Sequence, residues 1–150
     1  MTGFNLDNSI GYQIERTEQC MKRELRRTFN EHGFNITPYQ WIILYRLWQQ
    51  EGLTQAEIAD HTIRDKPTIT RMIDVMEKHG LLVRRNDHND RRAYKIYLTD
   101  SGRQLKEKLP MIVASHIEKA CEGISSKELE ITFDTLAKIC RNFESSSEQK

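Results

Sequence analysis

The chain of 150 residues contains little cysteine, proline or glycine, and these shortages exclude several kinds of protein. Its three cysteines, Cys20, Cys121 and Cys140, are too far apart for a CxxC metal motif and too few for a disulfide framework. No run of apolar residues approaches the roughly 18 that a membrane-spanning helix needs. The first residues lack the basic and apolar regions of a signal peptide. We therefore expect one globular domain over residues 1–150, located in the cytoplasm and without a membrane partner.

Patterns typical of catalysis are also missing from the sequence. With 7 glycines, few loops could hold a substrate, and there is no HExxH motif, pair of catalytic carboxylates or Ser-His-Asp spacing. His88 lies between Asp87 and Asp90, but three polar residues in one loop rarely bind a metal ion. The sequence thus predicts a protein that is not an enzyme and that carries no cofactor and no metal.

Positive charge is concentrated in one stretch, although the net charge of the whole chain is only +1. From Arg64 to Lys95 there are 9 basic and 5 acidic residues, a difference of +4, whereas Glu118 to Lys150 has 5 basic and 7 acidic, a difference of −2. A solvated surface would give the same counts, so charge alone does not decide the function. A local basic surface is nevertheless what nucleic-acid binding requires.

Two short helices are predicted inside this region. Thr54 and Glu57 form a capping box that starts the first helix, which should end near Thr62. Asp65 caps the second helix, and Gly80 ends it. One face of the second helix is apolar and should pack on the core, while its first turns suit the major groove of DNA. The residues that we assign to DNA contact there are Lys66, Pro67, Thr68, Thr70 and Arg71.

Two basic strands should follow the second helix directly. The first covers residues 82–85 and the second residues 93–98, where apolar and polar residues alternate. The polar loop between them, residues 86–92, ends in two arginines, and a loop of this size can place an arginine in the minor groove. Of Arg84 and Arg85 we expect one to contact phosphate and one to be exposed. The residues assigned to DNA contact in this hairpin are Arg84, Asp90, Arg91 and Arg92.

The remaining helices carry long apolar stripes. The first should run from a cap at Asn8 or Ser9 to about residue 32, and a capping box at Thr37 with Gln40 starts an apolar second helix. After the strands, a helix begins near residue 101, with a bend rather than a break before Pro110. A further capping box at residues 125–128 starts the last helix. These outer helices have more apolar surface than one small domain can cover, so we expect them to pack against a second copy.

The pattern resembles the MarR (multiple-antibiotic-resistance regulator) family of bacterial transcription factors. Four motifs occur in family order and at family spacing, and the resemblance extends over essentially the whole chain. It implies a homodimer that binds DNA as a repressor or activator and is often released by a small ligand. It also implies that Asp90 orients Arg92 while an arginine of the loop enters the minor groove. The motifs are residues 65–71 (DKPTITR), 77–81 (EKHGL), 90–93 (DRRA) and 98–102 (LTDSG).

The sequence therefore predicts a mainly α fold: a winged helix-turn-helix with a two-stranded β wing and long N- and C-terminal dimerisation helices. Residues 34–102 form the DNA-binding head, and residues 1–33 and 103–150 the dimerisation helices. We expect a homodimer that reads double-stranded DNA at a near-palindromic operator, with half-sites roughly 10 bp apart. A small effector, such as an anionic aromatic molecule, would release it. The candidate ligand residues are Arg16, Trp41, Tyr45 and Trp48.

Two alternatives stay open at this point. Some members of that family use a cysteine of the first helix as a peroxide switch, and Cys20 lies in the corresponding helix among basic residues. A winged helix can also serve as a protein-interaction module, although such a module would not need a basic second helix or arginines in the loop of the hairpin. Weak, salt-insensitive DNA binding would favour the interaction module.

Overall fold

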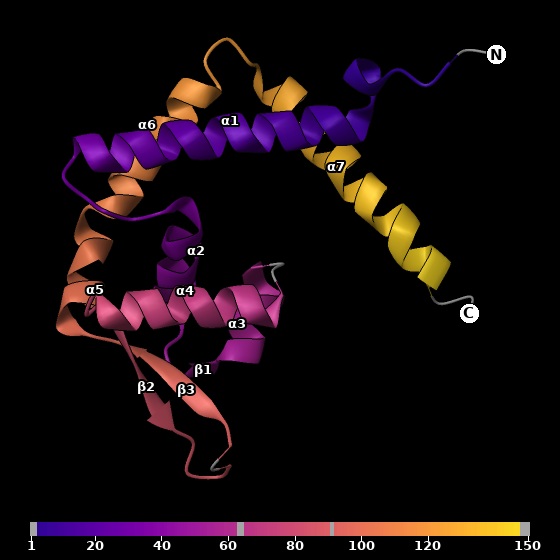
Figure 1. Ribbon diagram of the computed structural model, residues 1–150. Helices are drawn as coiled ribbons and strands as arrows, with labels where there is room; N and C mark the ends of the chain where they lie inside the picture. Colours follow the sequence, from indigo (N-terminus) through magenta and orange to yellow (C-terminus); the bar gives the residue numbers. More distant parts are fainter. Residues whose placement is uncertain (1–2, 63–64, 91, 148–150) are drawn as a thin grey trace. The chain divides into compact units, whose positions relative to one another are not determined.

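A computed structural model describes residues 3–62, 65–90 and 92–147 (Figure 1). The chain divides into two compact units, Met1–His116 and Ile117–Lys150. Among the described residues, none of the helices is long and apolar enough to cross a membrane.

The starts of the first two α-helices were predicted from capping residues, whereas the short 3-10 helix before them was not. A short 3-10 helix, η1 (Leu6–Asn8), precedes α1 (Ile10–Glu31), and the hydroxyl of Ser9 accepts the amide of Tyr12 at its first turn. The next helix, α2 (Pro38–Gln49), starts at the predicted capping box. The Gln40 backbone amide donates to the Thr37 hydroxyl at 3.1 Å, and the Thr37 backbone amide donates to the Gln40 side-chain oxygen, also at 3.1 Å. Local hydrogen bonding therefore determines both boundaries.

The head contains α3 (Gln55–Thr62), α4 (Lys66–Lys78) and a small sheet of β1 (Leu53–Thr54), β2 (Leu82–Asn86) and β3 (Tyr94–Leu98). The strand order is β1-β3-β2, and both pairs are antiparallel. The predicted two-stranded wing is formed by β2 and β3, and β1 is a further strand that the sequence did not predict, in which the buried Leu53 pairs with Ile96. The Gly52 amide extends this pairing by donating to the Ile96 carbonyl at 2.8 Å. Strand β1 therefore connects the wing to the start of α3.

The core of the head lies between α2, α3, α4 and the sheet. Apolar side chains from each element are fully buried, and burial of this kind contributes about 1.5–3 kcal/mol for each large side chain. On β3 the predicted alternation holds for Ile96 and Leu98, which are buried, whereas Tyr94 is exposed beyond the edge of the core. The buried residues of this core include Ile43, Leu44, Leu47, Ile58, Ile69, Ile73, Met76 and Leu82.

The helix expected after the wing is interrupted more strongly than predicted. It consists of α5 (Asp100–Gln104), a 3-10 turn, η2 (Leu105–Glu107), and α6 (Leu109–Ala120). We expected a bend without a break, and the break is the correction. Pro110 lacks an N–H group to donate to the carbonyl four residues before it, and its ring clashes with that carbonyl, so the chain tightens before the proline. The Lys108 amide accordingly bonds to the Leu105 carbonyl, at 3.2 Å.

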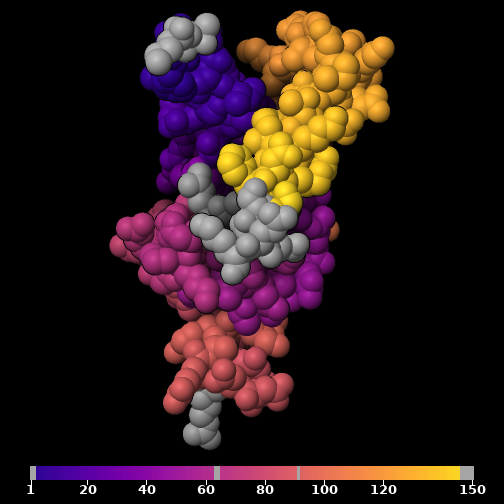
Figure 2. Space-filling model, turned by 90° about the vertical axis from the view of Figure 1, so that its right-hand side faces the viewer, coloured from indigo at the N-terminus to yellow at the C-terminus, as the bar shows by residue number. Residues whose placement is uncertain are grey.

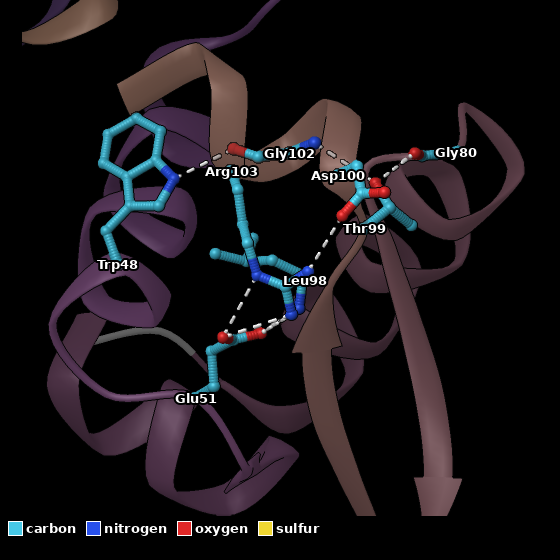
Figure 3. Close-up of polar contacts among 8 residues, drawn as sticks. All are labelled: Trp48, Glu51, Gly80, Leu98, Thr99, Asp100, Gly102 and Arg103. Carbon is cyan, nitrogen blue, oxygen red and sulfur yellow. Dashed lines mark hydrogen bonds and ion pairs between the residues drawn. The ribbon is translucent and has the colours of Figure 1, made fainter. Parts of the chain in front are cut away.

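A set of polar contacts joins α2 to the end of the wing (Figure 3). The Trp48 indole N–H donates to the Gly102 carbonyl at 2.9 Å, and the Glu51 carboxylate accepts the Leu98 amide at 2.8 Å. Arg103 donates to Glu51 with an Nη2–Oε1 distance of 2.9 Å. Burial raises the pKa of Glu51, but the bonds from Arg103 and the Leu98 amide together hold this pKa below its ordinary value. These contacts fix the base of the wing within the head.

The second unit contains α7 (Ser126–Ser147). Its start is the predicted capping box, in which the Ser125 amide and hydroxyl both donate to the Glu128 carboxylate and the Glu128 amide donates to the Ser125 hydroxyl. Several large apolar side chains of α7 are exposed in this single chain. They are Ile131, Phe133, Leu136 and Phe143.

Candidate nucleic-acid interface

The candidate interface begins at the N-terminus of α4. The Asp65 carboxylate accepts the Thr68 amide at 2.8 Å, and bonds from the Thr68 amide and hydroxyl hold the pKa of Asp65 below its ordinary value. Lys66, Pro67 and Arg71 are exposed, as expected for residues that can reach a ligand. The helix dipole adds partial positive charge at this end, so an anionic backbone such as that of DNA is favoured there.

The two threonines of this helix are less free than the basic residues. Thr68 and Thr70 are half-buried. The Thr70 hydroxyl donates to the Lys66 carbonyl at 2.9 Å and accepts from the Gln55 side-chain amide at 3.0 Å. One lone pair of this hydroxyl remains for a further donor. The Thr70 side chain is therefore oriented before any ligand arrives.

The opposite face of α4 fixes which residues face outward. Ile69, Ile73 and Met76 are almost completely buried in the head, at the helical spacing predicted from the sequence. Because these three buried side chains fix the rotation of α4 about its axis, Lys66 and Arg71 are held on the solvent side.

The end of α4 is marked by Gly80, which has a φ of +72°, a value that other residues rarely adopt.

The β2–β3 hairpin projects from the head as a wing (Figure 2). In its loop the Asp90 carboxylate accepts the backbone amide of Arg92 at 2.9 Å, and the Asp90 carbonyl accepts the Ala93 amide at 3.1 Å. Asp90 thus shapes the turn that carries Arg92, whose side chain is exposed. Arg91, also predicted for DNA contact, lies outside the described residues.

The two arginines of β2 point in opposite directions. Arg85 is exposed, and its guanidinium carbon lies 4.9 Å from the centre of the Tyr97 ring. The side chain of Arg84 is only 17% exposed and forms ion pairs with Asp74 and Glu77 of α4. The prediction that one of the pair is exposed therefore applies to Arg85. Arg84, which we had assigned to DNA contact, is turned toward the protein.

Sequence reasoning missed the residues that surround Arg84. Gln55, Asp74 and Glu77 were not proposed for the site, although each bonds to the Arg84 guanidinium. One signal could have found this arrangement. Arg84 is two residues after the buried Leu82, and alternate residues of a strand share a face.

Three of the four candidate ligand residues form an aromatic group on α2. The Trp41 ring centre is 5.5 Å from that of Tyr45 and 5.7 Å from that of Trp48. Arg16 is exposed on α1. A separate hollow of about 360 Å³ lies near the α1–α2 loop, and none of the four predicted residues lines it. Its lining consists of Gly33, Phe34, Asn35, Ile36, His79, Leu81 and Leu105.

Two of the three cysteines are exposed, and the metal-binding capacity of the described residues can be judged directly. Cys20 and Cys140 are exposed and Cys121 is half-buried in this single chain. The Arg23 guanidinium lies 3.8 Å from the Cys20 sulfur. Within the part of the chain that the structure describes, no group of three or more His, Cys, Asp or Glu side chains could hold a metal ion.

Comparison with known proteins relates this arrangement to one family. The sequence model of the MarR family matches residues 36–94. The chain is 31% identical to the organic hydroperoxide resistance transcriptional regulator of Bacillus subtilis over 105 residues. This stretch covers 70% of this chain and 70% of that protein. It is 29% identical over 135 residues to the HTH-type transcriptional regulator TtmR of Methylorubrum extorquens, covering 90% of this chain and 67% of TtmR.

Solved structures give the same result. The transcriptional repressor CouR, bound to a 23-mer DNA duplex, matches with a TM-score of 0.79 and 26% identity over 93% of this chain and 99% of that one. The MepR–DNA complex of S. aureus matches with a TM-score of 0.81 and 28% identity over 89% of this chain and 98% of that one. The predicted winged helix-turn-helix fold is confirmed, and these relatives are regulators rather than enzymes.

Proposed function

The chain belongs to the MarR family of transcriptional regulators, and on that basis we propose that it is a homodimeric repressor released from its operator by a small ligand. In this proposal residues 34–102 form the DNA-binding head, and residues 1–33 and 103–150 dimerise as parts of one MarR-type domain. The cytoplasm is its expected location.

The observation that carries the proposal is the set of exposed cations on two neighbouring elements of the head. Lys66 and Arg71 are exposed on α4, and Arg85 and Arg92 on the wing. We propose that α4 enters the major groove, where arginine can bond to guanine through two N–H groups, and that the wing reaches the adjacent minor groove. DNA complexes of relatives with this fold support the arrangement. Pro67, Thr68, Thr70 and Arg91 complete the proposed contact set, with Asp90 shaping the loop.

Exposed apolar side chains at both ends of the chain support the homodimer. Phe4 is 83% exposed and Ile10 60% in the first unit, and Phe133 is 65% exposed in the second. A second copy of the chain would cover these side chains, which otherwise face water. A dimer would present two copies of α4 to half-sites roughly 10 bp apart, so the operator should be a near-palindrome.

The aromatic group on α2 supports a ligand site near the dimerisation helices. Trp41 and Tyr45 offer ring faces, and Arg16 offers a charge for an anionic aromatic ligand. In this site Trp48 would contact the ligand only through its ring and would not donate a hydrogen bond to it, because its indole N–H already bonds to the Gly102 carbonyl. A ligand that prefers one spacing of the two heads would shift the dimer away from the spacing that DNA requires.

The test of the proposal is selection of genomic DNA fragments by the purified protein at two salt concentrations, followed by footprinting. Recovery of one near-palindrome, with binding that weakens steeply as salt rises, is the expected result, because phosphate contacts release counterions. Recovery of random fragments, or salt-insensitive weak binding, would overturn the proposal and favour a protein-interaction module.

Two substitutions on α4 locate the reading residues within that operator. Arg71→Ala should weaken operator binding by about 1–3 kcal/mol and relax the preference at one base pair. Lys78→Ala is the matched control, since Lys78 is also exposed but lies at the other end of the helix. If Arg71→Ala bound operator and random DNA as the unmodified protein does, the assignment of Arg71 would be wrong.

A further inference from the structure

Arg84 is surrounded by acceptors from two other elements of the head. Its Nε donates to the Gln55 side-chain oxygen at 2.9 Å, and its Nη1 to Glu77 Oε1 at 3.0 Å. Its Nη2 group lies 2.5 Å from Asp74 Oδ1 and 3.4 Å from the Thr70 carbonyl oxygen. Four of the five N–H groups of this guanidinium are thus directed to protein acceptors, which leaves little bonding capacity for DNA.

The same contacts connect the wing to the helix that carries the proposed base contacts. Glu77 accepts from Arg84 twice, because its second oxygen also accepts the Arg84 backbone amide at 2.9 Å. The Gln55 side chain continues the chain of bonds, since its oxygen accepts from Arg84 while its nitrogen donates to the Thr70 hydroxyl. Arg84 therefore links β2, the start of α3 and the middle of α4 through one planar group.

We propose that Arg84 is a positioning residue for DNA recognition, which holds α4 in register with the wing and does not itself contact DNA. This inference rests on the proposed DNA-binding function. Arg71 and Thr70 lie on the stretch of α4 that Arg84 holds, so a rotation or slide of α4 would displace them from the groove. Arginine suits this role better than lysine, because its fork-shaped group can bond to several fixed acceptors at once.

The proposal and a direct phosphate contact make opposite predictions for Glu77→Gln. If Arg84 contacted phosphate, removing a neighbouring negative charge would free the arginine and strengthen DNA binding. If Arg84 positions α4, the glutamine has one oxygen where two are needed, and operator binding should weaken by about 10-fold, the loss expected for one charge-assisted hydrogen bond. Asp60→Asn is the matched control, because Asp60 is an exposed carboxylate of α3 outside this network.

Arg84→Lys provides the second test. A lysine would keep a phosphate contact. The proposal would therefore be overturned if Arg84→Lys bound the operator with near-normal affinity and Arg84→Ala showed a salt dependence shallower by a slope of about 0.9. We expect instead that Arg84→Lys loses about as much operator affinity as Glu77→Gln, with the salt slope of the unmodified protein. Operator affinity should fall more than affinity for random DNA, because a displaced α4 loses base contacts first.

The measurement is fluorescence anisotropy of the selected operator and of a random duplex, with the full-length protein at several salt concentrations. Titration against excess operator gives the active fraction, so partial unfolding of a variant does not mimic weak binding. Tighter binding by Glu77→Gln than by Asp60→Asn would refute the positioning role. Failure of the unmodified protein to select any operator would refute the proposed function itself, and the two failures are thus distinguishable.

Discussion

Gly102 lies where the turn after α4, the end of β3 and the start of α5 meet. It is buried, its carbonyl accepts the Trp48 indole N–H, and its amide donates to the Thr99 hydroxyl at 3.1 Å (Figure 3). A Cβ atom at this position would overlap the carbonyl oxygen of Leu81 and lie 3.1 Å from Cδ2 of Leu98. That carbonyl cannot easily move, because it accepts the Thr99 amide at 3.1 Å.

Two effects of Gly102→Ala oppose each other, and their sizes decide the sign. Alanine gains about 1 kcal/mol over glycine in a helix. Overpacking of a buried site costs about 1–3 kcal/mol, and an overlap with backbone belongs at the upper end of that range. We therefore expect a net loss of about 2 kcal/mol in the free energy of unfolding. For a chain of this size the loss corresponds to a fall in Tm of about 4–8 °C.

The assay is thermal unfolding followed by circular dichroism, at one protein concentration for all variants because the stability of a dimer depends on concentration. Gly11→Ala is the control, since Gly11 is exposed in the first turn of α1 and a Cβ there would meet nothing nearer than the Ser9 hydroxyl at 3.9 Å. It should raise Tm by about 2–4 °C. A similar rise for Gly102→Ala would refute the close approach of α5 to the turn after α4.

Three further changes test the head. Because the folded-state pKa of Glu51 is lowered, its stabilisation is present above the ordinary value of 4.5 and is lost as pH falls through the folded-state pKa. In urea unfolding at neutral pH, Glu51→Gln should therefore have a lower free energy of unfolding than the unmodified protein. The two free energies should converge in acid. Thr37→Ala should lose about 1 kcal/mol in the same assay, since it removes a helix cap. Trp48→Phe should cost about 1–2 kcal/mol more than Trp41→Phe, because it leaves the Gly102 carbonyl without its indole donor. Equal losses would contradict the role of that bond.

The sequence predicted best those features that depend on near neighbours in the chain. The caps at Thr37, Thr54, Asp65 and Ser125 place the starts of α2, α3, α4 and α7 because each involves residues three apart. Helical spacing likewise predicted the buried face of α4. The family motifs then predicted the order of these elements.

Features that depend on distant contacts were not predictable in the same way. Glu51 is 47 residues from Leu98 and 52 from Arg103, and no local pattern indicates that they meet. The pairing of β1 with β3 also joins residues that are far apart in the sequence. The inward orientation of Arg84 follows from strand alternation, but its partner Gln55 is 29 residues away. A basic residue in a basic stretch thus looked like a DNA contact until its neighbours were known.

The arrangement of charge, rather than its sum, explains how a chain with a net charge of +1 can offer a basic surface. The acidic residues of α4 and its cap have internal partners: Asp74 and Glu77 both form ion pairs with Arg84, while the Asp65 cap accepts the Thr68 amide and keeps its charge. The exposed cations of the head are then less opposed by nearby acids. On this argument Glu77→Gln, which makes the chain more positive, should still weaken operator binding. That result would show that in this head a correctly held helix contributes more to recognition than one additional unit of positive charge.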